Sequence, residues 1–180
     1  QEPVDLEYLA SEVVRQLQVI AGGVKVSLQI GPGEPVSVVG DPDRLRQLVL
    51  NLVDNAIKYT LPGGEAKVRV QCEGDRGRLD VSDTGPGISP EHLKPGPGGV
   101  PLIFERFYRA EKSRSRAAGT ANGNGRPGSG TGLGLSIAHW IVQAHSGQID
   151  VQSEMGKGTT FTVWLPLYPS LVQPVKLTLL

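Results

Sequence analysis

The chain has 180 residues, of which 38% are apolar, and this fraction predicts one folded domain with a sizeable core rather than a disordered chain. Its 18 Lys and Arg residues balance 18 Asp and Glu residues, so its net charge argues against nucleic acid or a membrane surface as a partner. Cys72 is the single cysteine, which excludes an intrachain disulfide and a thiolate zinc site and favours a reducing compartment. The sequence contains no long apolar run, so we expect no membrane contact by this chain.

Periodic apolar residues predict a helix, two strands and a second helix in the first third of the chain. Residues 5–18 carry apolar side chains at helical spacing, whereas residues 24–30 and 36–39 are typical of short strands. Asp41 precedes a proline in the pattern of a helix N-cap. The wide apolar stripe that follows predicts a strong helix over residues 42–60.

The middle of the chain is predicted to contain a hairpin and two irregular segments. Strands at 66–72 and 78–81 are joined by a turn that contains glycine. Residues 94–101 read Lys-Pro-Gly-Pro-Gly-Gly-Val-Pro, a composition that excludes regular structure. Residues 117–130 are rich in Gly, Ala and Asn and are predicted to form a loop.

A third helix and two more strands are expected in the last third. The helix should run from about Gly132 to His145, and the strands should occupy residues 148–153 and 159–165. Residues 167–180 show no clear pattern and are predicted to be a C-terminal tail. Hairpin-linked strands with helices between them predict an α+β fold, a two-layer sandwich of one mixed, mostly antiparallel sheet with helices on one face.

Three polar residues of the predicted 42–60 helix border its apolar stripe. Asn51, Asn55 and Lys58 fall within about 60° of one another around the helix axis. Amides beside a core face need partners, because an unsatisfied buried amide costs about 1–3 kcal/mol. A metal-bound polyphosphate would supply those partners, and capping of neighbouring loops by the two asparagines is the alternative.

A carboxylate and two glycines follow the strand that ends at residue 81, in the segment Asp83-Thr84-Gly85-Pro86-Gly87. The aspartate is an acceptor in a space that few side chains fill. An exocyclic amine could reach it while a flat ring lies against the glycines. A tight turn that contains an aspartate is the alternative interpretation of this segment alone.

Glycines also open the third predicted helix, over residues 130–136 (Gly-Thr-Gly-Leu-Gly-Leu-Ser). Glycines at a helix N-terminus let backbone N–H groups approach phosphate oxygens. The segment is not a Walker loop, because the only Gly-Lys pair is Gly156-Lys157 and Val151 stands where that motif needs its first glycine. A loop rather than a strand precedes the segment, which excludes a dinucleotide-binding fingerprint.

Together these segments resemble the catalytic domain of sensor histidine kinases, in the superfamily shared with gyrase-type, chaperone and mismatch-repair ATPases. Residues 51–60 (Asn-Leu-Val-Asp-Asn-Ala-Ile-Lys-Tyr-Thr) resemble the N box, and residues 83–88 resemble the G1 box. Residues 103–109 (Ile-Phe-Glu-Arg-Phe-Tyr-Arg) are similar to the F box, residues 130–136 to the G2 box and residues 156–161 to the closing Gly-Thr strand motif. The resemblance implies the Bergerat-type ATP-binding fold.

The resemblance implies ATP and Mg²⁺ as ligands and a role for each matched residue. Asn51 would ligate the metal, and Asp83 would accept a hydrogen bond from the adenine amino group. The residues expected to bind ATP are Asn51, Asn55, Lys58, Tyr59, Asp83, Gly85, Gly87, Ile88, Phe107, Tyr108, Arg109, Gly130, Thr131, Gly132, Leu133, Gly134, Leu135, Thr159 and Thr160. The residues expected to act in phosphoryl transfer are Asn51, Lys58 and Arg109.

A basic segment is expected to close over the nucleotide. Between Arg106 and Arg126 six basic residues accompany a single acid, Glu111. A positive segment in a neutral chain suits a small polyanion. By the resemblance, residues 110–131 would form a lid over ATP, within a catalytic domain that spans residues 1–166.

The first residue of the N box bears on the reaction. Hydrolysing relatives place a glutamate there to activate water, whereas Asn51 cannot accept a proton, so we expect phosphoryl transfer with slow ATP hydrolysis. None of the three histidines, His92, His139 and His145, lies in a phosphoacceptor motif of the family. The expected acceptor is a histidine on a separate dimerisation domain, with a response regulator downstream in two-component signalling.

Two alternatives stay open at this stage. An anti-sigma-type serine protein kinase has the same fold, but residues 103–109 look like those of sensor kinases. A domain that senses ATP without catalysis is the second alternative, because the insertion at 94–101 or the glycine-rich lid could misplace the F box. We expect a cytoplasmic location, and the start at Gln1 suggests a piece of a longer protein anchored in the inner membrane.

Overall fold

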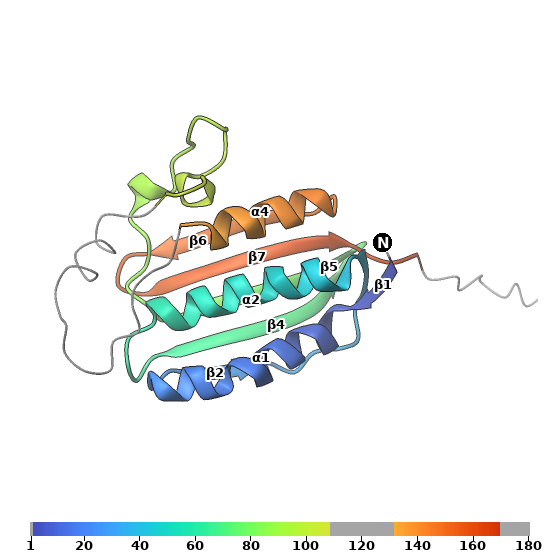
Figure 1. Cartoon of the computed structure of the whole chain (residues 1–180), viewed down its shortest axis with the longest axis horizontal. Coiled ribbons are helices and arrows are strands. Elements are labelled where there is room, and N and C mark those ends of the chain that lie inside the picture. The colour runs from blue at the N-terminus through green and yellow to red at the C-terminus, as the bar shows by residue number, and fades with distance from the viewer. Residues whose placement is uncertain (1, 109–131, 170–180) are drawn as a thin grey trace, which may run out of the picture.

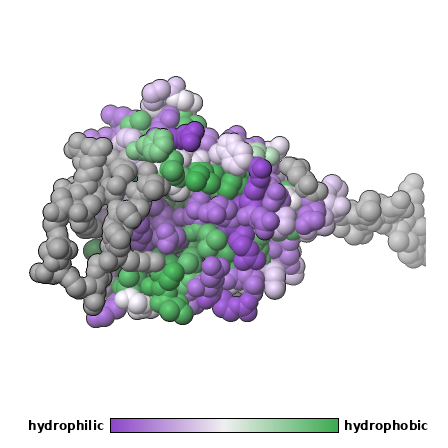
Figure 2. All heavy atoms as spheres, in the orientation of Figure 1, coloured by the Kyte–Doolittle hydropathy of each residue, from purple (hydrophilic) through white to green (hydrophobic). Residues whose placement is uncertain are grey.

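The computed structural model describes residues 2–108 and 132–169, and these form two layers. Helices α1 (Leu6–Gly23), α2 (Pro42–Tyr59) and α4 (Gly134–Ala144) lie side by side across one face of a sheet (Figure 1). The predicted α+β sandwich is therefore confirmed. Figure 2 views this face and shows hydrophilic side chains along its middle, over α2, with hydrophobic ones on either side.

The main sheet has five strands in the order β2-β4-β5-β7-β6. Their bounds are Ser27–Ile30, Glu65–Glu73, Arg76–Asp83, Gly158–Pro166 and Gln148–Glu154, respectively. β2 pairs with β4 in parallel, and the other three pairs are antiparallel. The mixed, mostly antiparallel sheet that the sequence predicts is thus present.

Alternating side chains of the central strands face the helices and form the core. The even-numbered residues of β4 up to Val70 and the odd-numbered residues of β5 up to Val81 are buried, as are the odd-numbered residues of β7, because side chains alternate along a strand. These buried residues are Ala66, Val68, Val70, Leu79, Val81, Phe161, Val163 and Leu165. Because Asp83 and Thr159 continue the same odd-numbered rows, their side chains lie on the helix-bearing face at the end of the sheet.

α2 begins and packs as its sequence predicts. The Asp41 carboxylate accepts hydrogen bonds from the backbone N–H groups of Asp43 and Arg44 at 3.0 and 3.1 Å, a cap of the kind that contributes about 1 kcal/mol. The apolar stripe of α2 is buried against α1, α4 and the sheet, at Leu45, Leu48, Val49, Leu52, Val53, Ala56 and Ile57.

A small second sheet was not predicted. β1 (Glu2–Asp5) pairs antiparallel with β3 (Ser37–Gly40), and the Leu6 backbone N–H donates to the Val36 carbonyl oxygen at 2.9 Å. The prediction of a helix from residue 5 omitted β1. Four residues with one buried side chain, Val4, are too short to show a period of two.

The irregular segment predicted at residues 94–101 is confirmed and lies between two 3₁₀ helices, η1 (Pro90–His92) and η2 (Leu102–Phe104). An isolated bridge joins Pro95 to Pro101. At the end of the chain, Leu167 forms another isolated bridge, to Val38 of β3, and residues 170–180 lie outside the described part. None of the described helices is both long and apolar enough to cross a membrane.

Candidate functional site

The C-terminal half of α2 presents the predicted polar residues at the edge of the core. Asn51, Asn55 and Lys58 are half-buried, whereas their neighbours Leu52 and Ala56 are buried. A helical spacing of four and three residues places the three polar side chains along one edge of α2. The structure therefore brings these three predicted residues together.

The Asn51 amide connects α2 to the start of α4. Its Nδ2 donates to the Gly134 carbonyl oxygen at 3.2 Å, and its Oδ1 accepts from the Gln47 Nε2 at 2.7 Å. These two contacts fix which amide atom is the acceptor. Among the described residues Oδ1 has this one donor, and a carbonyl oxygen can accept a second hydrogen bond or a metal ion. Sequence reasoning missed Gln47, although it precedes Asn51 by one helical turn.

The last turn of α2 carries Lys58 and Tyr59. The Lys58 ammonium lies 5.5 Å from the centroid of the Tyr59 ring, a cation–π contact. The Tyr59 side chain is 38% exposed. The end of the helix thus carries a cation and an aromatic ring, groups that suit a phosphate and a planar group, respectively.

Asp83 ends β5, and its carboxylate is largely removed from solvent. Burial raises the pKa of the Asp83 carboxyl, while hydrogen bonds from the Gly85 and Thr159 backbone oppose part of that shift. The Gly85 N–H donates to Oδ1 at 2.8 Å. A carboxylate has about four lone-pair sites, so these two backbone contacts leave acceptor capacity for an external donor. A half-buried carboxylate with lone pairs still available is suited to accept a hydrogen bond from a ligand amine.

The loop that follows Asp83, residues 84–88 (here called the G1 loop), contacts the end of α2. A Cβ atom at Gly85 would lie 2.9 Å from the Tyr59 carbonyl oxygen and 2.8 Å from Asp83 Oδ1. Only glycine leaves the required space. Because Tyr59 follows Asn55 by about one turn of α2, the carboxylate and the amide edge of α2 belong to one site.

The other side of the G1 loop contacts the β6–β7 turn. Gly87 has a φ of +76°, and a Cβ atom there would lie 2.3 Å from the Glu154 carbonyl oxygen. Gly158 has a φ of +124°, and its Cβ would lie 1.9 Å from the Asp83 carbonyl oxygen. Both positions need glycine for conformation and for space. The closing motif contains Gly158, but sequence reasoning gave it no role.

The two predicted threonines lie on opposite faces of the sheet. Thr159 is buried and pairs with Asp83 on the helix-bearing face. Thr160 pairs with Ser82 on the open face, where it lines a shallow hollow with Lys67 and other polar side chains. Because successive residues of a strand alternate in direction, both cannot reach the same ligand. Only Thr159 stays in the candidate site.

The end of the F box lies beside the start of the G2 box. The Phe107 N–H donates to the Gly132 carbonyl oxygen at 3.1 Å. Phe107 has a φ of +63°, unusual for a bulky residue, and its side chain is 67% exposed. The Tyr108 hydroxyl is hydrogen-bonded to His92 Nδ1.

Phe104 anchors the F box in the core. Its ring stacks on His139 of α4 with centroids 5.4 Å apart and meets Phe161 edge-on at 6.2 Å. Burial lowers the pKa of His139, and the Glu105 carboxylate opposes that shift in part. The imidazole therefore has a packing role between α4 and the F box.

α4 begins at Gly134, two residues later than predicted. Leu133 precedes it, and the Ser136 hydroxyl donates to the Leu133 carbonyl oxygen at 2.9 Å. Leu135 is half-buried against the core. The backbone N–H groups at the N-terminus of this helix are suited to bind anions. Arg109, Gly130, Thr131 and the lid predicted over residues 110–131 lie outside the described residues.

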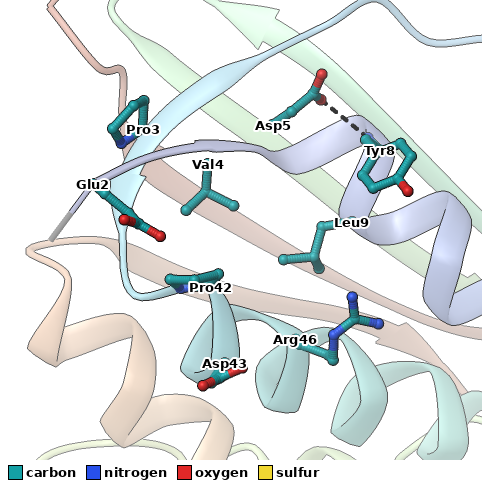
Figure 3. Close-up of a pocket in the computed structure, with 9 residues that line it drawn as sticks. All are labelled: Glu2, Pro3, Val4, Asp5, Tyr8, Leu9, Pro42, Asp43 and Arg46. Carbon is teal, nitrogen blue, oxygen red and sulfur yellow. Dashed lines mark hydrogen bonds between the residues drawn. The ribbon is translucent and has the colours of Figure 1, made fainter.

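A separate surface hollow lies at the other end of α2. It is lined by Glu2, Pro3, Val4, Asp5, Tyr8, Leu9, Pro42, Asp43 and Arg46 (Figure 3). Asp43 and Asn55 are twelve residues apart on α2, which corresponds to about 18 Å along the helix. The hollow is therefore not part of the site around Asp83.

Residues 40–169 match the family of histidine kinase-, DNA gyrase B- and HSP90-like ATPases. The circadian input-output histidine kinase CikA of Synechococcus elongatus is 38% identical over 177 residues, which are 97% of this chain and 21% of that protein. The chain thus spans about a fifth of the length of this curated relative.

Solved structures have the same fold. The mycobacterial sensor histidine kinase MprB superposes with a TM-score of 0.70 at 29% identity, over 94% of this chain and 99% of that one. Full-length ShkA in complex with AMPPNP superposes with a TM-score of 0.72 at 27% identity, over 94% of this chain and 31% of that one.

Proposed function

This chain belongs to the histidine kinase-, DNA gyrase B- and HSP90-like ATPase family, and we propose that it binds Mg-ATP and donates the γ-phosphate to a histidine on a separate phosphoacceptor domain. ShkA, which has this fold, was solved with the ATP analogue AMPPNP. CikA and MprB are histidine kinases by name. These likenesses support ATP as the ligand.

The observation that carries the proposal is the setting of Asp83. Its carboxylate is half-buried, one oxygen is occupied by the Gly85 N–H, and glycine backbone flanks it on both sides. An adenine amino group would donate to a remaining lone pair of the carboxylate while the ring lies against Gly87. Thr159, on the same face of the sheet, would assist this contact.

The phosphate end would lie along the amide edge of α2. Asn51 Oδ1 is a hard oxygen ligand of the kind Mg²⁺ prefers, and bound Mg²⁺ would neutralise charge on the phosphate oxygens. Asn55 would support the metal and phosphates, and Lys58 would contact a phosphate. The first turn of α4 offers backbone N–H groups to the same anion.

The proposed reaction is transfer rather than hydrolysis. Asn51 stands where a catalytic glutamate would activate water, and an amide cannot act as a base. We therefore propose that water remains unactivated and that Arg109 stabilises the charge of the transferred phosphoryl group. Purified chain should hydrolyse ATP slowly, and rapid Mg-dependent hydrolysis would contradict this.

The phosphoacceptor must come from outside this chain. The sequence has three histidines: His92 is bonded to Tyr108, His139 is stacked on Phe104, and His145 is buried. None is an exposed, unconstrained nucleophile. A dimerisation domain with a histidine is the proposed partner, and a response regulator would receive the phosphoryl group afterwards.

Calorimetry of ATP binding with and without Mg²⁺ tests the nucleotide site. Asp83→Ala should weaken ATP affinity about 10- to 100-fold, the usual loss for a charge-assisted hydrogen bond. Asn51→Ala should abolish the gain in ATP affinity that Mg²⁺ gives. Asp54→Ala, an exposed residue of the same helix, is the matched control and should bind like the unmodified chain.

Labelled ATP and a supplied acceptor test the reaction. A histidine-bearing helix pair from a CikA-type kinase should acquire acid-labile label, and Arg109→Ala should slow that transfer with little change in ATP affinity. Acid-stable label on a serine of a small antagonist protein would instead identify a serine kinase. Tight ATP binding without transfer to either acceptor would identify a nucleotide sensor.

A further inference from the structure

Ser153 lies where β6, β7 and the G1 loop meet. Its hydroxyl oxygen accepts a hydrogen bond from the Ile88 backbone N–H at 2.8 Å. The same oxygen lies 3.0 Å from the Gly158 carbonyl oxygen and 2.9 Å from Thr159 Oγ1. One serine side chain therefore contacts both the G1 loop and the beginning of β7.

The strand register places this serine in one row with the proposed base-binding residues. Ser153 of β6 pairs with Thr159 of β7, and Thr159 pairs on its other side with Asp83 of β5. Paired residues of antiparallel strands project to the same face. Thr159 therefore lies between Ser153 and Asp83 on the face that carries the helices.

Ser153 also supplies the side-chain contact that fixes the G1 loop. The Gly156 N–H donates to the Pro86 carbonyl oxygen at 2.8 Å, a backbone contact. Gly87 lies against Glu154 backbone. Within residues 2–108 and 132–169, the bond from Ile88 to Ser153 is the one side-chain hydrogen bond between the loop and the β6–β7 hairpin.

The single proton of the Ser153 hydroxyl determines what Thr159 offers. If Ser153 donates to the Gly158 carbonyl, the Thr159 hydroxyl can donate to Ser153 and only its lone pairs face a ligand. If Ser153 donates to Thr159 Oγ1, the Thr159 proton is released for an external acceptor. Within the described part of the chain, Ser153 is the one hydrogen-bond partner of the Thr159 hydroxyl, so its loss would leave that hydroxyl without a fixed orientation.

We propose that Ser153 is a positioning residue for base recognition, which holds the G1 loop and the Thr159 hydroxyl in register with Asp83. The inference rests on the proposed function, because it concerns the base of the bound nucleotide. Adenine presents an amino donor beside a ring-nitrogen acceptor, which match a carboxylate and the hydroxyl proton that Thr159 offers when Ser153 donates to its Oγ1. Guanine presents an acceptor beside an N–H donor at the same edge, so it fits this pair poorly.

Nucleotide titrations of Ser153→Ala test the proposal. The Kd values for ATP and ADP should rise by the same factor, about tenfold, because the change is at the base and not at the phosphates. The Kd for GTP should change less, so the preference for ATP over GTP narrows. Ser153→Thr keeps the hydroxyl and should bind ATP within about threefold of the unmodified chain.

Two further variants separate positioning from a loss of structure. Ser82→Ala removes a hydroxyl from the open face of β5, where it lies 3.4 Å from the Lys67 carbonyl oxygen. This variant should leave the Kd values for ATP and GTP and the melting temperature unchanged. Thr159→Val removes the other hydroxyl of the pair and should narrow the preference for ATP as Ser153→Ala does. Thermal unfolding of each variant verifies that it is folded.

The possible outcomes distinguish the two proposals. If the unmodified chain binds ATP and Ser153→Ala keeps its affinity and selectivity, the role of Ser153 is wrong and the proposed function stands. Equal losses for ATP and GTP would reduce Ser153 to a structural residue and also overturn the inference. If the unmodified chain does not bind ATP, both proposals fail.

Discussion

His145, the C-cap residue of α4, accepts a hydrogen bond through Nε2 from the Asp41 backbone N–H at 3.0 Å, and so joins the end of α4 to the start of α2. Its Nδ1 donates to the Ile141 carbonyl oxygen at 2.7 Å, and its side chain is buried. The two helices that carry Asn51 and Gly134 are therefore connected at their far ends as well as at the candidate site.

Removal of this imidazole should destabilise the domain. His145→Ala leaves the Asp41 N–H without its acceptor and opens a cavity, so we expect the free energy of unfolding to fall by about 2–3 kcal/mol. Gln143→Ala, on the exposed side of α4, should change it by less than about 0.5 kcal/mol. Equal urea denaturation curves for the two variants would show that the connection is unimportant.

Gly156 in the β6–β7 turn and Gly158, the first residue of β7, separate steric exclusion from backbone strain. Gly156 has a φ of +81° with open space around its Cβ position, whereas the Cβ of Gly158 would meet Asp83 backbone. Gly156→Ala should cost about 1–2 kcal/mol, the strain of a left-handed conformation. Gly158→Ala should cost about 2 kcal/mol more, because the adjoining strand must move. Chemical denaturation of both variants gives the comparison, and similar costs would contradict the steric argument.

The sequence predicts the elements that have clear apolar periods. The stripe of α2 and the alternation in β4, β5 and β7 are long enough to be read without the structure. β1 could not be found in this way, because its one buried side chain, Val4, is defined by pairing with β3. Long-range pairing of this kind leaves no local pattern.

The site was predicted unevenly for a similar reason. Asn51, Asn55 and Asp83 could be named because they stand in motifs, and the structure brings them into one region. Ser153 has no sequence signal, since its role comes from the register of β6 on β7. The choice between Thr159 and Thr160 also needed the strand direction, which fixes the face each side chain occupies.

Asp83 should lower the stability of the domain, although it contributes to the affinity for ATP. Its pKa is raised by burial, so the fold holds the proton more tightly than the unfolded chain does. The associated stability is present below the ordinary carboxyl pKa of about 3.9 and is lost as the pH rises through the higher pKa of the folded state. At pH 7.5 without nucleotide, Asp83→Asn should therefore unfold at a higher temperature than the unmodified chain.

With saturating ATP, the unmodified chain should instead melt at a higher temperature than Asp83→Asn. A ligand at 100 times its Kd stabilises the folded state by about 2.7 kcal/mol, and the unmodified chain alone should gain this. Melting curves of both proteins, with and without ATP and across pH 4 to about 8, provide the test. If Asp83→Asn melts lower without nucleotide, the carboxylate is not destabilising the fold.

His139 should make the domain sensitive to mild acid. Burial between α4 and the F box lowers its pKa, so the unfolded chain binds a proton more readily than the folded one. Stability should be complete above the ordinary histidine pKa of about 6.5 and should decline as the pH falls through the lower pKa of the folded state. The fall in melting temperature between pH 7.5 and 5.5 should be smaller in His139→Leu, whatever its absolute stability. Phe104→Leu uncovers the imidazole and should also make the fall in melting temperature with pH smaller. An unchanged pH slope in both variants would assign the acid sensitivity to other groups.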